Sequence, residues 1–394
     1  MNLSKVRRLS ALLLVGLIGV AAGCVPLPAD ANWGHLSIID DQIAISFHDR
    51  LALISPDDFR PVPLLDGEGQ PRRDDQGNAR TWTLMSGGRC IPDCFYAAPM
   101  RLDENTFLVA SYNKKLVEVD IAAARIDETR SEIGGHIAGN PVLTDEMVYV
   151  PFSELNLVAL HRDDYSVAWT LETQRGVWTQ PLYVPEENLL IVASMDHFIY
   201  AVDALTGEEV WTVDLEGAVG ATPLLYEGNL YVGSFDGNVA RITLDGQVTG
   251  MFTGAEEWIW GTPALATEEN GDLTLYAADT KGFVYALAVE EDGFRELWRR
   301  QVAQQAIRSA PIVHDDQLII ASRDHNVYWL NRETGDTIEV QTAGGEVLAD
   351  MLLLEPGDLP SIDQSTLVVL TMILPPKFAV FNANTGGELG RYDF

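Results

Sequence analysis

Cysteine is scarce in this chain of 394 residues, where it occurs only as Cys24, Cys90 and Cys94. A fold built on a disulfide framework needs more, so we expect hydrophobic packing to hold the core. Basic residues are also few, with 26 Lys and Arg against 58 Asp and Glu and a formal net charge of −32. This balance disfavours nucleic acid as a partner and disfavours electrostatic docking on anionic lipid.

Recognisable catalytic signatures are missing as well. The sequence has no G-x-S-x-G elbow, no H-E-x-x-H, no P-loop and no D-x-D-G calcium loop. Carboxylates are so numerous that no single pair of them is informative. After residue 23, no apolar run is long enough to span a bilayer. We therefore expect a protein without catalytic residues, a resident cofactor or a metal site.

An apolar run within residues 1–23 predicts an export signal. Basic residues precede the run, and small residues lead from it directly into Cys24. A run this short is typical of export rather than of a membrane span. Its end resembles the lipobox of bacterial lipoproteins, which implies cleavage before Cys24 and lipidation of that residue. An ordinary secretory signal is the alternative. With lipidation, residues 24–32 become a short tether outside the cytoplasmic membrane, on the periplasmic or extracellular side.

What the sequence has in quantity is an internal repeat. One copy, Leu190–Trp211, holds two short apolar runs and two turns, and similar copies start at Leu230, Leu275 and Leu318. Such runs, rich in β-branched and aromatic residues, predict consecutive antiparallel strands. A period near 40 residues predicts a β-propeller. Aligned on the end of their first inner run, eight copies place these residues in one slot: Ser46, Ser111, Phe152, Ser194, Ser234, Asp279, Ser322 and Thr371.

A second periodic signal runs in register with the first. It consists of the prolines Pro99, Pro141, Pro181, Pro223, Pro263 and Pro311. Branched or aromatic residues lie four positions before each proline, and small residues lie two positions before. This alternation fits an innermost strand packed tightly between neighbouring blades. We therefore predict an all-β fold, a single eight-bladed propeller of four-stranded antiparallel blades over residues 33–394.

The turns, an insertion and the chain ends give further expectations. His197 and His325 share a tight-turn slot with Gly237 and Gly282, so we interpret them as turn residues at positive φ rather than as metal ligands. The polar insertion at residues 66–80 predicts a surface loop. The first repeat begins with its innermost strand and the last ends with an outer strand. We therefore expect blades 1 and 8 to be the least regular and the ring to close by packing alone.

The second turn of the repeat has the form [N/D]-x-x-T-G, as in Asp203–Gly207 and Asn331–Gly335. Its Asx side chain can bond the backbone ahead of it, and its glycine takes the left-handed position. The tryptophans Trp169, Trp211 and Trp298 follow such turns or their counterparts, and we expect each ring to bury against the next blade.

These motifs resemble the PQQ-like repeats, over nearly the whole chain after the signal. That superfamily includes quinoprotein dehydrogenases and the BamB-type lipoproteins of outer-membrane barrel assembly. The chain's modest length and lipobox look more like the BamB type. The resemblance implies a non-catalytic, monomeric scaffold that binds envelope proteins through a loop face or a blade edge and touches the membrane only through its lipid. The alternatives are a dehydrogenase holding pyrroloquinoline quinone with calcium beside Trp178 or Trp260, and a carbohydrate-binding or sensor lipoprotein.

One slot of the innermost strand carries the candidate site. Three residues before the prolines stand Tyr96, Ala138, Trp178, Gly220, Trp260 and Arg308, with Leu348 equivalent in the last repeat. If the slot faces the channel, its aromatic rings and guanidinium form a cradle for a flat ligand or an extended peptide. The interpretation that we favour is alternation of large and small residues that plugs a tapered channel.

Two cysteines lie shortly before this slot. Cys90 and Cys94 are predicted to form a local disulfide outside the cytoplasm. A redox site is the weaker interpretation, because their C-x3-C spacing differs from the C-x-x-C of thiol oxidoreductases.

Overall fold

The computed structural model describes residues 34–47, 50–85, 95, 97–112, 114–132, 135–137, 139–154, 156–372 and 377–393. The predicted signal peptide, Cys24 and the tether lie outside the described residues, as do Cys90, Cys94, Tyr96 and Ala138. Residues 33–394 form one unit. In the described part of the chain, no helix has both the length and the apolarity needed to cross a bilayer.

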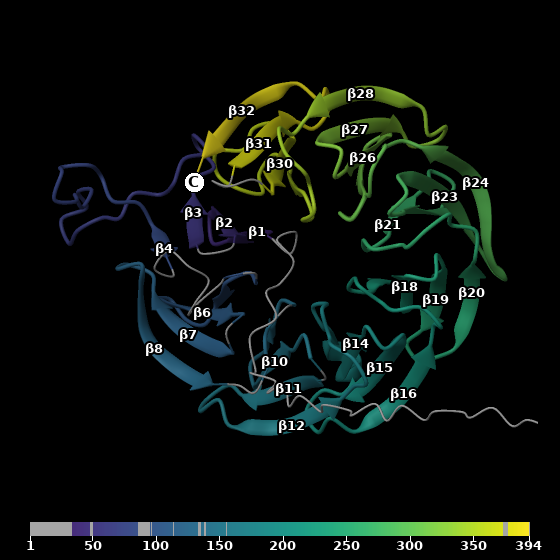
Figure 1. Ribbon diagram of the computed structural model, residues 1–394, viewed down its shortest axis with the longest axis horizontal. Coiled ribbons are helices and arrows are strands. Elements are labelled where there is room, and N and C mark those ends of the chain that lie inside the picture. The colour runs from purple at the N-terminus through teal and green to yellow at the C-terminus, as the bar shows by residue number, and fades with distance from the viewer. Residues whose placement is uncertain are drawn as a thin grey trace, which may run out of the picture. The chain divides into compact units, whose positions relative to one another are not determined.

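The fold is an eight-bladed propeller, as predicted, with each blade a four-stranded antiparallel sheet (Figure 1). Blades 1 and 2 contain β1 (Gly34–Ile39), β2 (Gln42–Phe47), β3 (Arg50–Ile54), β4 (Thr83–Met85), β5 (Met100–Arg101), β6 (Thr106–Ser111), β7 (Lys115–Asp120) and β8 (Arg125–Glu132). Blades 3 and 4 contain β9 (Val142–Leu143), β10 (Met147–Pro151), β11 (Asn156–His161), β12 (Val167–Glu172), β13 (Leu182–Val184), the 3-10 turn η1 (Pro185–Glu187), β14 (Leu189–Ala193), β15 (Phe198–Asp203) and β16 (Glu209–Asp214).

The second half of the ring follows the same plan. Blades 5 and 6 contain β17 (Leu224–Tyr226), β18 (Asn229–Gly233), β19 (Val239–Thr243), β20 (Val248–Phe252), β21 (Ala264–Thr267), β22 (Leu273–Ala278), β23 (Phe283–Glu290) and β24 (Gly293–Gln301). Blades 7 and 8 contain β25 (Ile312–His314), β26 (Gln317–Ala321), β27 (Asn326–Asn331), β28 (Thr337–Thr342), β29 (Leu352–Leu354), β30 (Thr366–Thr371), β31 (Lys377–Asn382) and β32 (Glu388–Asp393).

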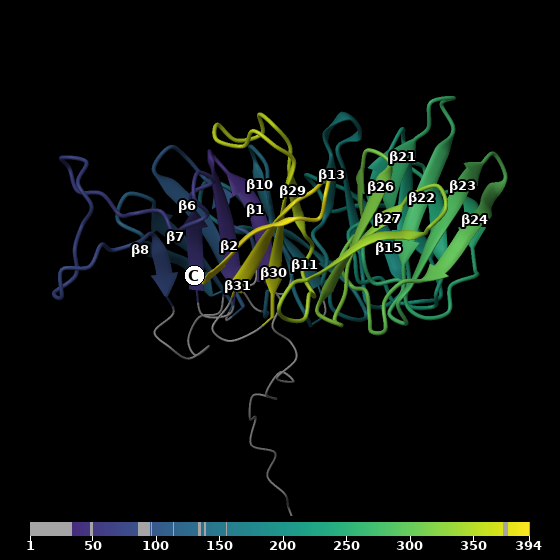
Figure 2. The same ribbon diagram turned by 90° about the horizontal axis from the view of Figure 1, so that it is seen from above.

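Each blade is a simple meander, built from consecutive strands that run from the channel outward. Connections between first and second strands therefore lie at the same end of a blade as those between third and fourth strands. We call this end the turn face, and the opposite end the hairpin face (Figure 2 shows the ring from the side). The predicted turn residues His197 and His325 lie at the hairpin face with φ of 71° and 74°, as the sequence indicated.

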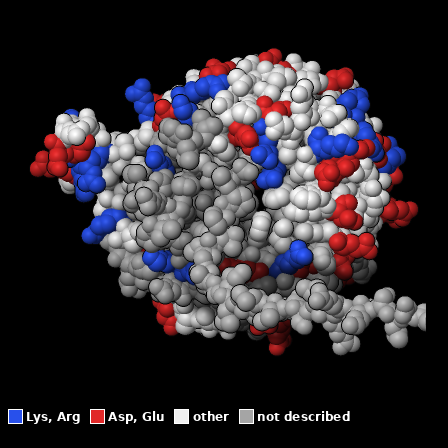
Figure 3. All heavy atoms as spheres, in the orientation of Figure 1, with Lys and Arg blue, Asp and Glu red and all other residues white. Residues whose placement is uncertain are grey.

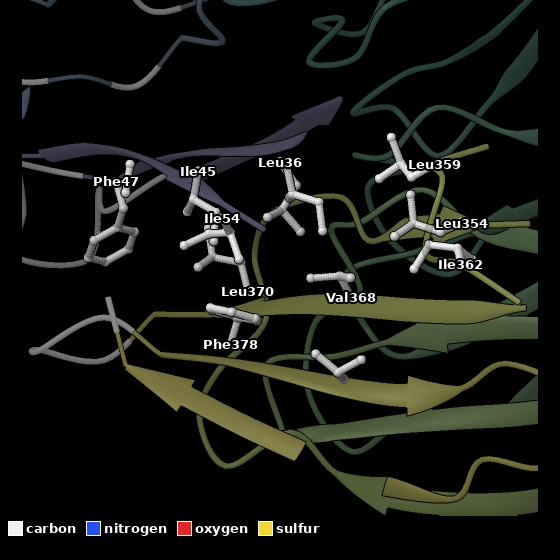
Figure 4. Close-up of a cluster of buried hydrophobic side chains, with 13 residues drawn as sticks. Leu36, Ile45, Phe47, Ile54, Leu354, Leu359, Ile362, Val368, Leu370 and Phe378 are labelled. Carbon is white, nitrogen blue, oxygen red and sulfur yellow. The ribbon is translucent and has the colours of Figure 1, made fainter. Parts of the chain in front are cut away.

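The ring closes without sharing a strand between the chain ends. Blade 1 takes all four strands from the start of the propeller, and blade 8 takes all four from its end. One hydrophobic cluster joins the two blades (Figure 4), formed by Leu36, Ile43, Ile45, Phe47, Ala52 and Ile54 of blade 1 with Leu354, Leu359, Ile362, Val368, Leu370, Phe378 and Val380 around and within blade 8. The prediction that packing closes the ring is confirmed.

Most other joints use a directional contact as well. The indole N–H of Trp169 donates to the carbonyl of Ala204 in the next blade, at 3.1 Å. The indoles of Trp82, Trp211, Trp298 and Trp329 make the same bond to Ile121, Leu244, Arg332 and Ala383, and every accepting carbonyl is the second residue of a turn between third and fourth strands. The expected docking of the tryptophans on the next blade is confirmed.

Two constraints favour glycine at the end of the turn between third and fourth strands. Gly207 has φ of 72°, which an L side chain adopts only with strain. A Cβ atom at this position would also lie 2.5 Å from Trp169 Cδ2. Gly246 and Gly335 lie against Trp211 and Trp298 in the same way. An indole on the outer strand and a glycine on the facing turn therefore form a matched pair.

The predicted surface loop is an arm of three paired segments on the outside of blade 1, seen at the left of Figure 1. Its backbone pairing begins next to Leu53 and Val62. Farther out, the bridges Pro63–Thr81, Leu65–Pro71 and Arg73–Ala79 pair residues 63–65, 71–73 and 79–81 with one another. Asp66 and Asp74 each accept two backbone N–H groups and close two similar turns along it. Residues 66–80 are almost all exposed, as expected.

Candidate ligand pocket in the central channel

A pocket of about 390 Å³ opens in the channel at the centre of the ring. Its volume is within the range of small-molecule sites, about 300–1,000 Å³. The innermost strands and the segments leading into them supply its walls, which consist of Gly34, His35, Gly139, Asn140, Trp178, Thr179, Gln180, Gly220, Ala221, Thr222, Trp260, Gly261, Thr262, Arg308, Leu348, Ala349 and Asp350.

The predicted channel slot does face this pocket. Trp178, Trp260 and Arg308 all line it, and so do Gly220 and Leu348 from the same slot. The two remaining members, Tyr96 and Ala138, lie outside the described residues. Large and small residues alternate from Trp178 through Gly220 to Trp260, as the plug interpretation expects, but Arg308 and Leu348 continue the slot with large residues, and the described walls enclose an open volume.

Small residues beside the slot let the blades approach closely. A Cβ atom at Gly139 would lie 2.5 Å from the Thr179 carbonyl oxygen, and one at Gly261 would lie 2.8 Å from that of Ser309. A side chain at either glycine would therefore push neighbouring blades apart. The tight packing predicted for the innermost strands is confirmed here, and it fixes the wall of the pocket.

An aromatic column supports one side of the pocket. The ring of Phe235 stacks between Trp258 and Trp260, with centroid distances of 5.2 Å and 4.6 Å. The guanidinium carbon of Arg308 lies 4.3 Å from the Trp260 ring centroid, a cation–π contact. Phe235 also fills the space that a side chain at Gly220 would occupy. The column fixes the positions of Trp260 and Arg308.

The rim of the pocket is polar and links successive blades. Asn140 accepts a hydrogen bond from the Ala98 N–H at 2.9 Å, and its amide nitrogen lies 3.0 Å from His35 Nε2. Asp350 accepts the Ala310 N–H at 2.6 Å. Thr222 donates to the Gln180 carbonyl at 3.0 Å and so links blades 5 and 4. The residues immediately before the prolines therefore form a belt of hydrogen bonds around the channel, which sequence reasoning missed.

The charges of the pocket balance. Arg308 and Asp350 are the two ionised side chains among its walls. Burial lowers the pKa of His35, although the nearby Asp350 carboxylate offsets part of that effect. His35 is therefore neutral at pH 7, and the described lining carries one positive and one negative charge.

At the hairpin face, three carboxylates support the loops that lead into the innermost strands, and two of them, Asp196 and Asp279, are buried. Asp196 accepts the Gln174 N–H at 2.7 Å and the Tyr200 hydroxyl at 2.9 Å. Asp279 with Tyr285, and Asp324 with Tyr328, do the same for the amides of Glu256 and Gln304. Burial and the bond to Asp324 raise the pKa of Tyr328 to about 12. The Asp-x-x-x-Tyr spacing of two of the pairs was a signal that sequence reasoning did not use.

The described donors do not fit a calcium-dependent cofactor. Calcium takes six to eight oxygen ligands, mostly from carboxylates and carbonyls. Asp350 is the single carboxylate on the described pocket wall, and one of its oxygens already accepts the Ala310 N–H. Across the described residues, no group of three or more His, Cys, Asp and Glu side chains is placed to hold a metal ion.

Comparison with known proteins gives a consistent result. A family model described as "Outer membrane protein assembly factor BamB" matches residues 156–260. The assembly factor BamB of Shewanella oneidensis is 22% identical over 231 residues, which cover 54% of this chain. This match spans 55% of the length of that relative, which is about half of it. A quinohemoprotein alcohol dehydrogenase of Comamonas testosteroni is 28% identical over 152 residues, which cover 35% of this chain and 20% of the enzyme.

A solved structure supports the fold. The crystal structure of BamB from Moraxella catarrhalis has a TM-score of 0.57 at 17% sequence identity, and the superposition covers 76% of this chain and 90% of the other. With eight four-stranded blades, PQQ-like turn motifs and these similarities, the chain is a PQQ-like β-propeller that resembles the BamB proteins.

Proposed function

We propose that this protein is a non-catalytic, lipid-anchored scaffold at the bacterial cell envelope that binds proteins of outer-membrane assembly. The observation that carries the proposal is the similarity to BamB assembly factors over more than half of the chain. The lipobox resemblance at Cys24 supports an anchor on the outer side of the cytoplasmic membrane. The absence of an aspartate directly after Cys24 is compatible with transfer to the outer membrane.

The blade edges are poor docking sites, which favours a loop face. The outer strand pairs of blades 2 to 8 each contain a shift in register. Bulges of this kind bend an edge strand away from a straight template and hinder the addition of another strand. At the bulges of β16 and β28, the extra residues are the exposed Val210 and Ile338. We therefore propose that partners dock on the ends of the blades.

Charged residues on the two faces allow a test of which face binds the partners. In the view of Figure 3, acidic and basic side chains are interspersed over the visible described surface. On the turn face, Glu186, Glu187 and Glu333 are exposed, and on the hairpin face Glu216 and Glu257 are exposed. Charge reversal changes attraction to a partner without altering the core. These residues provide one variant for each face.

The test is co-purification of the full-length lipidated chain from envelopes of its own organism, with mass spectrometry of what it retains. We expect barrel-assembly proteins with the wild type, and loss of them in one of two variants, E186K/E187K/E333K or E216K/E257K. A matched edge variant, V210K/I338K, should retain them. Loss in the edge variant alone would overturn the loop-face proposal. Absence of any assembly protein with the wild type would overturn the scaffold function itself.

The anchor has its own test. Metabolic labelling with an alkyne fatty acid should label the wild type, and Cys24→Ser should remove the label and release the propeller from the membrane fraction. An unlabelled wild type that is soluble after export would contradict lipidation. The predicted Cys90–Cys94 disulfide is checked by thiol counting on the exported, denatured chain, which should show no free thiol from this pair.

A PQQ-dependent dehydrogenase is the second candidate, and the similarity to the quinohemoprotein enzyme is the observation that favours it. Adding pyrroloquinoline quinone and calcium to the purified chain and recording absorbance and dye reduction with alcohols tests it. We expect no binding at micromolar quinone, because the described pocket wall lacks a set of calcium ligands. Saturable binding with dye reduction would establish the enzyme instead.

A further inference from the structure

We propose that the channel pocket binds a small neutral sugar, a mono- or disaccharide, between Trp178, Trp260 and the polar rim. This inference is independent of the scaffold function, because it concerns the channel rather than the faces on which partners dock. It rests on the shape of the pocket, on its aromatic walls and on the balance of its charged groups.

The aromatic walls suit the apolar faces of a sugar ring. Trp178 and Trp260 line the same pocket, separated along the chain by the glycine of the intervening blade, Gly220. The stack of Phe235 and Trp258 beneath Trp260 holds that ring in position before any ligand arrives. An aromatic ring offers a large apolar contact area at little cost in conformational entropy. Sugar rings present C–H faces that pack on such a surface.

The polar groups suit hydroxyls, which both donate and accept hydrogen bonds. Asp350 can only accept and Arg308 can only donate, while the side-chain amides of Asn140 and Gln180 do both. All four side chains line the pocket together with the hydroxyls of Thr222 and Thr262. A polyhydroxylated ligand can form further hydrogen bonds with these groups, whereas an apolar ligand can form none.

The charge balance favours a neutral ligand over an anion. Arg308 alone would attract a carboxylate, and its contact with the Trp260 ring holds the guanidinium at the pocket wall. Asp350 faces the same pocket and would repel an anion, so the described wall has no net charge to offer. A neutral polyol meets no such repulsion. The same two groups would instead act as a matched acceptor and donor.

The test is calorimetric titration of the full-length purified chain with glucose, N-acetylglucosamine, maltose and trehalose, followed in parallel by tryptophan fluorescence. Glucuronate and a neutral dipeptide serve as the anionic and peptidic probes. We expect at least one neutral sugar to bind and to change the fluorescence, with glucuronate binding more weakly than glucose. No binding of any neutral sugar at millimolar concentration would overturn the proposal. Preferential binding of glucuronate or of the dipeptide would also overturn it.

Variants locate the site. Trp178→Ala and Trp260→Ala should each raise the sugar Kd by about tenfold or more. Asp350→Asn keeps an oxygen that can accept the Ala310 N–H, so the variant should fold. It should bind the neutral sugar more weakly and glucuronate more tightly than the wild type does. Val210→Ala, at an exposed position of the outer strand β16 and outside the pocket, is the control and should leave the sugar Kd within about twofold. A loss of binding in Val210→Ala with none in Trp178→Ala or Asp350→Asn would contradict the pocket.

Discussion

Two joints of this ring, the one between blades 3 and 4 and the one that closes the ring, differ in a way that explains the closure. At the joint between blades 3 and 4, a large ring on the outer strand, Trp169, covers a glycine on the next turn, Gly207. At the closing joint between blades 8 and 1 the sizes are exchanged. The turn residue is Phe59, also at positive φ, and the outer strand carries Gly390 in the register of the tryptophans.

The exchange keeps the joint filled. Phe59 packs on Tyr392 of β32 with a centroid distance of 5.8 Å, and Tyr392 stacks in turn on Phe378 at 5.3 Å. A Cβ atom at Gly390 would lie 2.6 Å from Tyr392 Oη, so the tyrosine covers the space above this glycine. Aromatic rings fill the closing joint, but Gly390 has no indole to donate the hydrogen bond of a regular joint. Close packing, rather than one particular residue, is what each joint requires.

A third solution appears between blades 5 and 6, where β23 and β24 form an extended hairpin in place of the Asx turn. Arg241 donates to the carbonyls of Glu290 and Glu291 at 2.8 Å and 2.6 Å. Gly250 occupies the tryptophan register here, because Gly293 lies against it. The geometry of the receiving turn thus determines which side chain the preceding blade presents.

The largest effect is expected at the joint between blades 7 and 8, where the indole comes from the third strand β27. Trp329 is fully buried and donates to the Ala383 carbonyl at 2.7 Å. Trp329→Ala should lower the free energy of unfolding by about 3–5 kcal/mol, because it leaves a cavity between blades 7 and 8 and an unbonded carbonyl. Urea unfolding measures this change. The exposed Val210→Ala should cost about 0.5 kcal/mol, and equal losses in the two variants would refute the role of the joint.

A comparable loss is expected at the closing joint, with a different local signature. Leu370 is buried between blades 8 and 1, and a Cβ atom at Gly34 would overlap it. Leu370→Ala should cost about 2–5 kcal/mol. Hydrogen exchange should accelerate first in β1 and β30, which face each other at the closure. Uniform acceleration around the ring would show that this joint is no weaker than the others.

The pairing of tryptophan with glycine can be separated from backbone strain. Gly207 and Gly228 have nearly the same φ, 72° and 73°, but a Cβ atom at Gly228 meets nothing within 4 Å. Both Gly→Ala variants should lower the free energy of unfolding by about 1–2 kcal/mol, because alanine disfavours the left-handed conformation. Gly207→Ala should lower it by about 1–3 kcal/mol more, since Trp169 must move. Equal losses by thermal or urea unfolding would remove the packing argument.

The smallest effect concerns pH. Tyr328, with a pKa of about 12, belongs to a regular blade, and an unfolded tyrosine ionises near pH 10. Between about pH 10 and 12 the unfolded chain loses a proton that the folded chain retains, so stability falls across this window. Tyr328→Phe should make the decline shallower there, as measured by urea unfolding at each pH. An unchanged slope would contradict the role of burial and Asp324.

The sequence allowed prediction of the repeated parts and not of the exceptions. Eight blades, the positive φ of His197 and the docking of Trp211 follow from spacing and turn chemistry, because they recur at a fixed period. The closing pair of Phe59 and Gly390 has no period, and its members lie at opposite ends of the propeller. The Asp279–Tyr285 pair was hidden for a related reason, since its spacing differs from that of Asp196 and Tyr200.

The candidate site was predicted in part. The slot of Trp178, Trp260 and Arg308 was expected to face the channel, and it does. The rim residues His35, Asn140 and Asp350 were not foreseen, because they come together only when the ring closes and brings blades 1, 3 and 8 around one pocket.

The measurement that tests this account most directly exchanges the sizes at the closing joint. The triple variant F59G/G390W/Y392V gives that joint the glycine and tryptophan of a regular one, with Val in the place that Val213 occupies beside Trp211. The account predicts that urea unfolding finds the triple variant within about 1 kcal/mol of the wild type, while F59G alone and G390W alone each lose about 1–3 kcal/mol. Losses that simply add in the triple variant would contradict the claim that matched packing closes the ring.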